Sequence, residues 1–205
     1  MGMRKVALIT DGWRRLFTYA WPAGILQRIR ETGEDVNLYI FNSTGNWSRD
    51  AGYNRAEYNI YNLPELSDFD GIILELNNIS SPAVLADVIS NAKRSGRPVV
   101  SIANELGDFY YVGIDNYSAM KQVIAHLHEV HDCKKFWLLV GAQDNYESSC
   151  RLQGMLDYAK EHKIKIDKDD IWYGSFDYKS GLEGYKHLWD RHKELPDAVI
   201  CINDN

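Results

Sequence analysis

Short apolar runs rich in β-branched residues alternate with amphipathic stretches along most of this chain. Most of the apolar runs lack polar alternation, which is typical of strands that are covered on both faces in a parallel sheet. The sequence predicts eight such strands, at Lys5–Thr10, Asp35–Phe41, Gly71–Glu75, Pro98–Ile102, Tyr110–Ile114, Lys135–Val140, Ile171–Tyr173 and Asp197–Ile202.

Helical periodicity occupies most of the segments between these strands. The predicted helices are Trp21–Glu31, Pro82–Ser95, Ser118–His131, Glu147–His162 and Ser180–His192. The second of them follows a serine pair and ends at a glycine, which is the usual chemistry of a helix start and stop. Because strands and helices alternate, we expect right-handed βαβ crossovers and a doubly wound α/β architecture.

The polar stretch Asn42–Leu66 interrupts this alternation. It is rich in Asn, Tyr and Ser and has no clean period. We interpret it as an irregular loop with at most one short helix, close to a ligand cleft or an interface.

The order of the elements predicts two α/β lobes, an N-terminal one at residues 3–116 and a C-terminal one at residues 117–205. Only three residues, Asn203 to Asn205, follow the last predicted strand. A parallel sheet needs helices on both faces. We therefore expect the second lobe to be incomplete and the chain to be part of a longer protein.

Composition and charge narrow the class of protein. A net charge of −6 and the absence of a basic run argue against direct contact with nucleic acid. No apolar run approaches the ~20 residues of a membrane span, and the N-terminus does not resemble a signal peptide. We expect a cytoplasmic protein without membrane contact, whose three cysteines are free thiols.

The sequence offers little for catalysis or for metal binding. It has no phosphate-binding loop and no Gly-x-Ser-x-Gly motif, so we expect a chain that is not an enzyme and needs no cofactor. His126, His128, His131 and Cys133 lie close together in sequence. On a helix His128 and His131 share a face while His126 and His128 point apart, so we expect a solvated helix end and no metal site.

Four motifs keep their order and approximate spacing over about a hundred residues of the second half. They are Val112-Gly-Ile-Asp-Asn116, Arg151-Leu-Gln-Gly-Met155, Gly174-Ser-Phe-Asp-Tyr-Lys-Ser-Gly181 and Pro196-Asp-Ala-Val-Ile-Cys-Ile-Asn-Asp204. Together they resemble the effector domain of LacI/GalR-family regulators, which is itself similar to periplasmic sugar-binding proteins. The first half matches more loosely, through Val6–Asp11, Gly24 and Phe69–Ile73.

The resemblance implies that two lobes close on a small molecule at the carboxyl ends of their strands, as expected for open α/β sheets. Arg151 stands at the position of an arginine that hydrogen-bonds ligand oxygens, and a guanidinium suits that task. Phe176 stands where the family places an aromatic ring against a sugar or heterocycle. Asn203 matches an asparagine whose amide both donates and accepts. Asp204 is expected to cap the next helix.

The first lobe carries a weaker set of expected binding residues. Asp11 closes the first strand, Arg15 falls on a polar family position and Phe17 on an aromatic one. Trp13 either stacks on the ligand or covers the loop.

The fourth strand departs from the family pattern. Many relatives carry an Asp-Arg pair after it, whereas this chain has Ala103-Asn104 followed by Glu105. That difference argues against a standard pyranose or furanose. We expect Asn104 and Glu105 to substitute, with a different pattern of hydroxyl or amine groups on the ligand.

The resemblance implies a sensor of a sugar or other small polar metabolite, with a homodimer formed through the first lobe. Its output is a transcription regulator or, alternatively, a fused signalling enzyme such as a diguanylate cyclase. An enzyme that reuses the same scaffold is the second class of function, because fold does not fix function.

Overall fold

A computed structural model describes residues 2–12, 16–44, 50–79 and 81–203, with the backbone alone at residues 16–18. The chain divides into two compact units, Met1–Gly113 and Ile114–Asn205, called unit 1 and unit 2 below.

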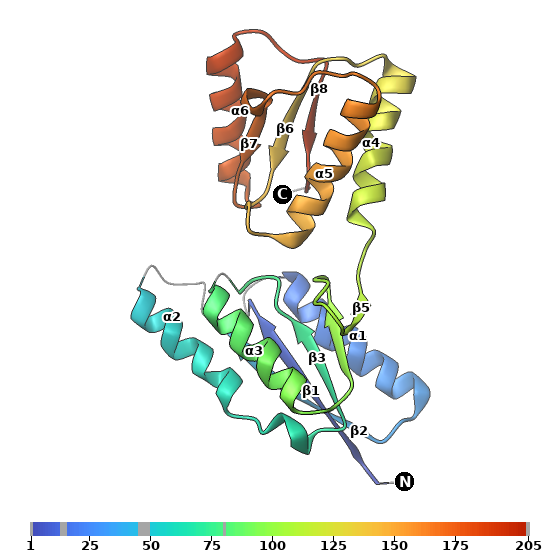
Figure 1. Ribbon diagram of the computed structural model, residues 1–205, viewed down its shortest axis with the longest axis vertical. Helices are drawn as coiled ribbons and strands as arrows, with labels where there is room; N and C mark the ends of the chain where they lie inside the picture. Colours follow the sequence, from blue (N-terminus) through green and yellow to red (C-terminus); the bar gives the residue numbers. More distant parts are fainter. Residues whose placement is uncertain (1, 13–15, 45–49, 80, 204–205) are drawn as a thin grey trace. The chain divides into compact units, whose positions relative to one another are not determined.

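Unit 1 is built on a five-stranded parallel sheet in the order β2-β1-β3-β4-β5 (Figure 1). In register, Val6 of β1 lies opposite Leu38 of β2 and Gly71 of β3. The chain moves outward from β1 to β2 and then crosses back past β1 to β3, so the winding direction changes between β1 and β3. The strands are β1 Arg4–Asp11, β2 Val36–Ser43, β3 Gly71–Glu75, β4 Val99–Ile102 and β5 Tyr110–Val112.

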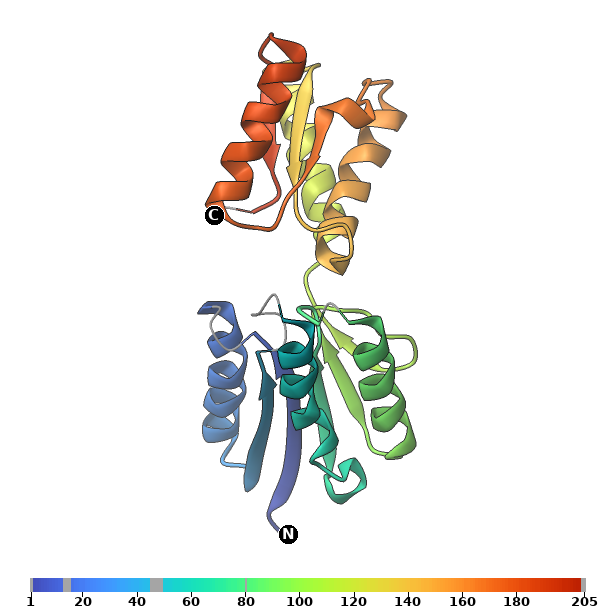
Figure 2. The ribbon, with the colours of Figure 1, turned by 90° about the vertical axis from the view of Figure 1, so that its left-hand side faces the viewer.

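Helices cover both faces of this sheet (Figures 1 and 2). Helix α1 (Leu16–Thr32) lies on one face, and α2 (Ala51–Glu57) and α3 (Pro82–Arg94) lie on the other. Helix α3 starts where the sequence predicts, because the Ser81 hydroxyl accepts a hydrogen bond from the Val84 amide and a proline occupies the first turn.

The stretch Asn42–Leu66 contains the short helix that the interpretation allowed, α2, but much of the rest of its described part is regular and not an irregular loop. Strand β2 extends to Ser43, and α2 runs directly into the 3₁₀ helix η1 (Tyr58–Asn62). A second 3₁₀ helix, η2, spans Leu66–Asp68. Helix α2 has no buried residue, so it shows no apolar period, while Tyr58 and Tyr61 of η1 are buried in the core of unit 1.

Unit 2 contains a three-stranded parallel sheet in the order β7-β6-β8. Helices α4 and α5 pack against each other on one face, and α6 packs on β6 and β7 from the other (Figure 1). The elements are α4 Asn116–His131, β6 Phe136–Val140, α5 Tyr146–Glu161, η3 Lys168–Asp170, β7 Ile171–Tyr173, α6 Tyr178–His192 and β8 Ala198–Cys201.

Gly154 brings α4 and α5 close together. A Cβ atom at this position would lie 2.3 Å from the backbone oxygen of Tyr117, so the two helices touch through main-chain atoms. On the sheet side of α5, Met155 is fully buried beside Leu138 of β6 and Ile124 of α4. The core of unit 2 thus lies between this helix pair and β6.

Every predicted strand and helix is present, and the parallel α/β fold predicted from the sequence is confirmed. The largest difference is at α1, which begins at Leu16 and not at Trp21, and every other bound agrees within two residues. Among the helices of the described ranges, none combines the length and the apolarity that crossing a bilayer requires.

Candidate functional site

The carboxyl ends of the strands identify where each unit would hold a ligand. In open α/β sheets, ligands bind outside these ends at the point where the winding direction changes. That point lies between β1 and β3 in unit 1 and between β6 and β8 in unit 2.

In unit 2, Arg151 reaches from α5 to the carboxyl end of β8. Its Nε donates a 2.7 Å hydrogen bond to Oδ1 of Asn116, and its Nη1 donates over 2.8 Å to the carbonyl oxygen of Ile202. Its Nη2 lies 4.0 Å from Oε1 of Glu147. The side chain is 22% exposed, so these contacts hold a partly accessible guanidinium in one orientation.

Phe176 and Asn203 meet at the same end of the sheet. Nδ2 of Asn203 donates a 3.2 Å hydrogen bond to the carbonyl oxygen of Phe176. The Phe176 ring packs directly on Gly141, where a Cβ atom would lie 2.1 Å from its Cζ. Because Ile202 and Asn203 are neighbours in sequence, the segment after β8 links Arg151 to Phe176.

A short, hydrogen-bonded loop positions Phe176. Its φ of +62° lies in the left-handed region, which costs a bulky residue free energy. Next to it, the Asp177 carboxylate accepts hydrogen bonds from the Ser175 hydroxyl (2.6 Å) and the Ser180 amide (2.8 Å). These bonds lower the pKa of Asp177, and the bond from the Ser175 hydroxyl has the larger effect. The loop therefore fixes the backbone that carries the ring.

Three further residues support this set, although no expectation from the sequence assigned them a role. Nδ2 of Asn116 donates to Oε1 of Glu147 over 3.3 Å. The Ser148 hydroxyl accepts a 3.1 Å hydrogen bond from the amide of Gly141. The position of Asn116 in one of the family-like motifs could have pointed to it from the sequence. No sequence motif marks Glu147 and Ser148, because only the folded helix brings them to the strand ends.

In unit 1, Asp11 ends β1 and is 1% exposed. Its carbonyl oxygen accepts a 3.1 Å hydrogen bond from Nδ2 of Asn78. On the adjacent strand, Glu75 is equally buried and accepts a 2.8 Å hydrogen bond from the Thr10 hydroxyl. Tyr61 donates to the carbonyl oxygen of Thr10 over 2.9 Å, and burial first and the nearby Asp11 charge second raise its pKa. Two carboxyl groups therefore lie at the switch point of unit 1.

Asn104 and Glu105 follow β4 at the same edge of the unit 1 sheet. Ala103 has a φ of +63°, and its amide donates a 2.9 Å hydrogen bond to the carbonyl oxygen of Val112. The Ser101 hydroxyl donates to the carbonyl oxygen of Asn104. Asn104 is half-buried and Glu105 is exposed. The turn that replaces the family's Asp-Arg pair is thus tightly hydrogen-bonded.

The remaining expected site residues lie outside what the structure describes. Trp13, Arg15 and Asp204 are not among the described residues. Phe17 lies in the first turn of α1, where only the backbone is described.

Described residues of both units form cavities. One of about 600 Å³ lies between α2, η1 and α3 of unit 1. One of about 290 Å³ lies beside the first turns of α5 in unit 2, between Gln143 and Tyr173. Neither is lined by Arg151, Phe176 or Asn203.

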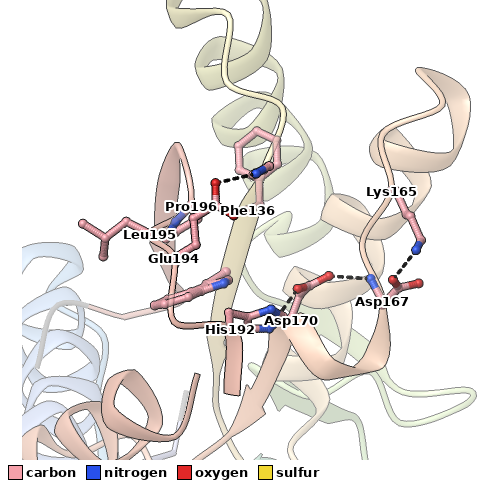
Figure 3. Close-up of a pocket in the computed structure, with 10 residues that line it drawn as sticks. Phe136, Lys165, Asp167, Asp170, His192, Glu194, Leu195 and Pro196 are labelled. Atoms are coloured by element: carbon pink, nitrogen blue, oxygen red, sulfur yellow. Dashed lines mark hydrogen bonds and ion pairs between the residues drawn. The ribbon is translucent and has the colours of Figure 1, made fainter. Parts of the chain in front are cut away.

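A third cavity, of about 270 Å³, lies at the amino ends of β6 and β8 and is shown in Figure 3. Each of its three basic side chains contacts an acidic one: Lys135 with Glu194, Lys165 with Asp167 and His192 with Asp170. The charged side chains that line this cavity are thus paired with one another.

The sequence and the fold are both similar to regulators of one family. The chain is 29% identical to catabolite control protein A of Staphylococcus epidermidis over 150 residues, 72% of this chain and 43% of that protein. Its identity to catabolite control protein A of Staphylococcus xylosus is 31% over 149 residues, with the same coverage of both chains. It thus spans less than half the length of these curated relatives. A scan against protein-family models gives no match.

Among solved structures, a LacI-family sugar-binding transcriptional regulator from Escherichia coli has a TM-score of 0.70 at 18% identity, over 98% of this chain and 68% of that chain. This chain has the fold of a LacI-family effector domain. The LacI-like fold also matches a CelR–cellobiose complex, with a TM-score of 0.68, 24% identity, and coverage of 96% and 58%.

A further neighbour of this LacI-like fold is a transporter solute-binding protein from Burkholderia multivorans. Its TM-score is 0.72 at 20% identity, over 98% of this chain and 71% of that chain. The predicted periplasmic-binding-protein-like architecture is therefore confirmed.

Proposed function

We propose that this LacI-like chain is the small-molecule-sensing domain of a transcription regulator and that its ligand is a sugar or another small polar metabolite. The fold and the sequence similarity to catabolite control protein A support a ligand-sensing role. One structural neighbour, CelR, is a complex with cellobiose, which supports a polar ligand with several hydroxyl groups.

The observation that carries this proposal is the link between Arg151, Phe176 and Asn203 at the carboxyl ends of β6 and β8. Two N–H groups of Arg151 donate to Asn116 and Ile202, and its other N–H groups can donate to ligand oxygens. A guanidinium, an aromatic ring and an amide are the groups that bind a polyhydroxylated ring. The same three residues were expected from the family resemblance.

Unit 1 would contribute acceptors to the ligand. Asp11 and Glu105 are carboxylates at the strand ends, and Asn104 offers an amide. Such a set suits hydroxyl or ammonium groups on the ligand and differs from the Asp-Arg pair of the family. That Asp11, Trp13, Arg15, Phe17, Asn104 and Glu105 contact the ligand stays a prediction.

The alternatives are less well supported than a regulator. The curated relatives that match are named as regulators and not as enzymes, which argues against catalysis by this scaffold. The same names favour a transcription regulator over a sensor fused to a diguanylate cyclase. By analogy with the lac repressor dimer, we also propose that two copies associate through unit 1.

A thermal-shift screen with sugars, nucleosides and amines tests the proposal. A ligand that binds only the folded state raises the melting temperature by mass action. We expect a shift without turnover of the compound, which would distinguish a sensor from an enzyme. Catalytic conversion of the stabilising compound would contradict the proposal.

Variants of Arg151 then test the site itself. Arg151→Lys keeps the charge and removes the planar fork of donors, so we expect it to weaken binding by about tenfold or more. Arg191→Ala, which removes an exposed arginine of α6 paired with Asp169, is the matched control. Unchanged affinity in Arg151→Lys and Asn203→Ala, with the fold intact by circular dichroism, would mean that the ligand binds elsewhere.

A further inference from the structure

Two histidines meet at the carboxyl-terminal end of α4, away from the strand ends. Nε2 of His126 and Nε2 of His131 are 3.2 Å apart, and their rings are nearly perpendicular, with centroids separated by 5.0 Å. His128 takes no part, because its Nδ1 lies 3.1 Å from the Tyr158 hydroxyl. His131 therefore contacts His126 and not His128, although helical spacing places His128 and His131 on one face.

We propose that His126 and His131 form a binding site for one divalent transition-metal ion, ligated by their two Nε2 atoms. An imidazole nitrogen binds Zn²⁺ at about 2.0–2.1 Å. Two such bonds that meet at roughly 100°, which is close to the tetrahedral angle, place their nitrogens about 3.2 Å apart. The observed separation thus suits chelation without rearrangement of the helix.

The Nε2 atom of each histidine can present a lone pair to the metal. For the two Nε2 atoms to form a hydrogen bond in the metal-free pair, one of them must carry the proton. A shift of that proton to Nδ1 of the same ring frees the second lone pair and leaves both rings neutral.

The electrostatic surroundings favour a cation. His131 is the last residue of the 16-residue helix α4, and its carboxyl-terminal end carries the negative pole of the helix dipole. Both histidines are exposed, so water completes the coordination sphere. Two charged residues that follow in sequence, Asp132 and Lys134, pair with each other over 3.0 Å.

The number and type of ligands indicate which ions bind. In the described ranges, no group of three or more His, Cys, Asp and Glu side chains is placed to hold a metal, so this site offers two protein ligands. A pair of imidazoles suits Cu²⁺, Ni²⁺ and Zn²⁺ and does not suit Mg²⁺ or Ca²⁺, which prefer oxygen ligands. The expected order of affinity has Cu²⁺ first, followed by Ni²⁺.

Calorimetric titration of chelator-treated protein with Cu²⁺ and with Ni²⁺ at pH 7.5 tests this site. We expect one ion per chain. His126→Ala and His131→Ala should each weaken binding by about tenfold or more, because even the loss of a residue that only supports a metal ligand has an effect of that size. His187→Ala is the matched control, because His187 is an exposed histidine of α6 that packs on Trp172. It should bind as the wild type does.

Two outcomes would overturn the proposal. Absence of Ni²⁺ and Cu²⁺ binding by the wild type would overturn the proposal. Binding that persists in the His126→Ala/His131→Ala double variant, with helix content unchanged by circular dichroism, would overturn it equally.

Discussion

The two units share one architecture but differ in the polar groups that gather at their strand ends. Unit 2 presents a guanidinium and an amide, Arg151 and Asn203, which also donate to main-chain carbonyl groups. Unit 1 presents the carboxyl groups of Asp11 and Glu75, both almost fully buried. The doubly wound sheet therefore fixes where polar groups gather, while the individual residues decide which hydrogen-bonding groups that place offers.

The units are alike in how their sheets are covered. Both sheets have helices on both faces and an edge strand with exposed apolar residues, Tyr110 and Val112 on β5 of unit 1 and Val199 and Cys201 on β8 of unit 2. Each unit nevertheless has its own buried core. We therefore expect each unit to respond to substitutions in its own core.

The largest effects should come from truncating one core leucine in each unit. Leu74 of β3 and Leu138 of β6 are fully buried, so Leu74→Ala and Leu138→Ala should each lower the free energy of unfolding by about 2–5 kcal/mol. Hydrogen exchange followed by mass spectrometry should show faster exchange in unit 1 for the first variant and in unit 2 for the second. Equal acceleration in both units for either variant would show one cooperative body.

A smaller but sharper effect is expected at Gly154. In Gly154→Ala the new methyl group meets the main-chain oxygen of Tyr117, which cannot turn aside as a side chain can. We expect a loss of about 1–3 kcal/mol by overpacking, measured by urea denaturation. Gly181→Ala in α6 is the control, since no atom lies within 4 Å of its added Cβ. A Gly154→Ala protein as stable as wild type would mean that α4 and α5 are further apart.

Asp177 caps the amino-terminal end of α6, so Asp177→Ala should lower the free energy of unfolding by about 1 kcal/mol at neutral pH. The pKa of this carboxyl group is lower in the folded state than in the unfolded state. Its contribution to the free energy of unfolding is therefore complete above the unfolded-state pKa of about 4, and it disappears as the pH falls through the folded-state pKa. The difference in denaturation midpoint between wild type and Asp177→Ala should shrink in acid. Asp177→Asn keeps a hydrogen-bond acceptor that does not titrate. At neutral pH it should therefore lower the free energy of unfolding by less than Asp177→Ala does.

The smallest effect should be a gain in unit 1. Gly24 lies in the middle of α1, and an added Cβ would meet nothing within 4 Å. Gly24→Ala should therefore stabilise unit 1 by up to about 1 kcal/mol through helix propensity. A rise in the unfolding midpoint would confirm this, and a fall would indicate that Gly24 is needed for a close contact.

Much of the fold could be predicted because burial leaves a periodic record in the sequence. Strands such as β3 and β6 consist almost wholly of apolar residues, and Ser81 with Pro82 marks the start of α3. Helix α2 could not be predicted in this way, because it buries no residue. Its neighbour η1 contributes only two tyrosines to the core, and in sequence these resemble part of a polar loop.

The candidate site was predictable only where a motif preserved it. Arg151, Phe176 and Asn203 are far apart in sequence, and no periodicity relates them, so their association came from the family resemblance alone. Glu147 and the Asp11–Glu75 arrangement were not foreseen in that way, because partners across a sheet or a helix pair are chosen by tertiary packing. The same reason explains why His126, and not His128, faces His131.

The close fit of the Phe176 ring over Gly141 has an evolutionary consequence. A lineage that acquires a side chain at position 141 must exchange the ring at position 176 for something smaller, since both cannot occupy the same space. Substitutions at these two positions should therefore occur together in descendants of this chain. Such a paired exchange would alter which molecular shapes the strand ends accept while leaving the surrounding helices and strands unchanged.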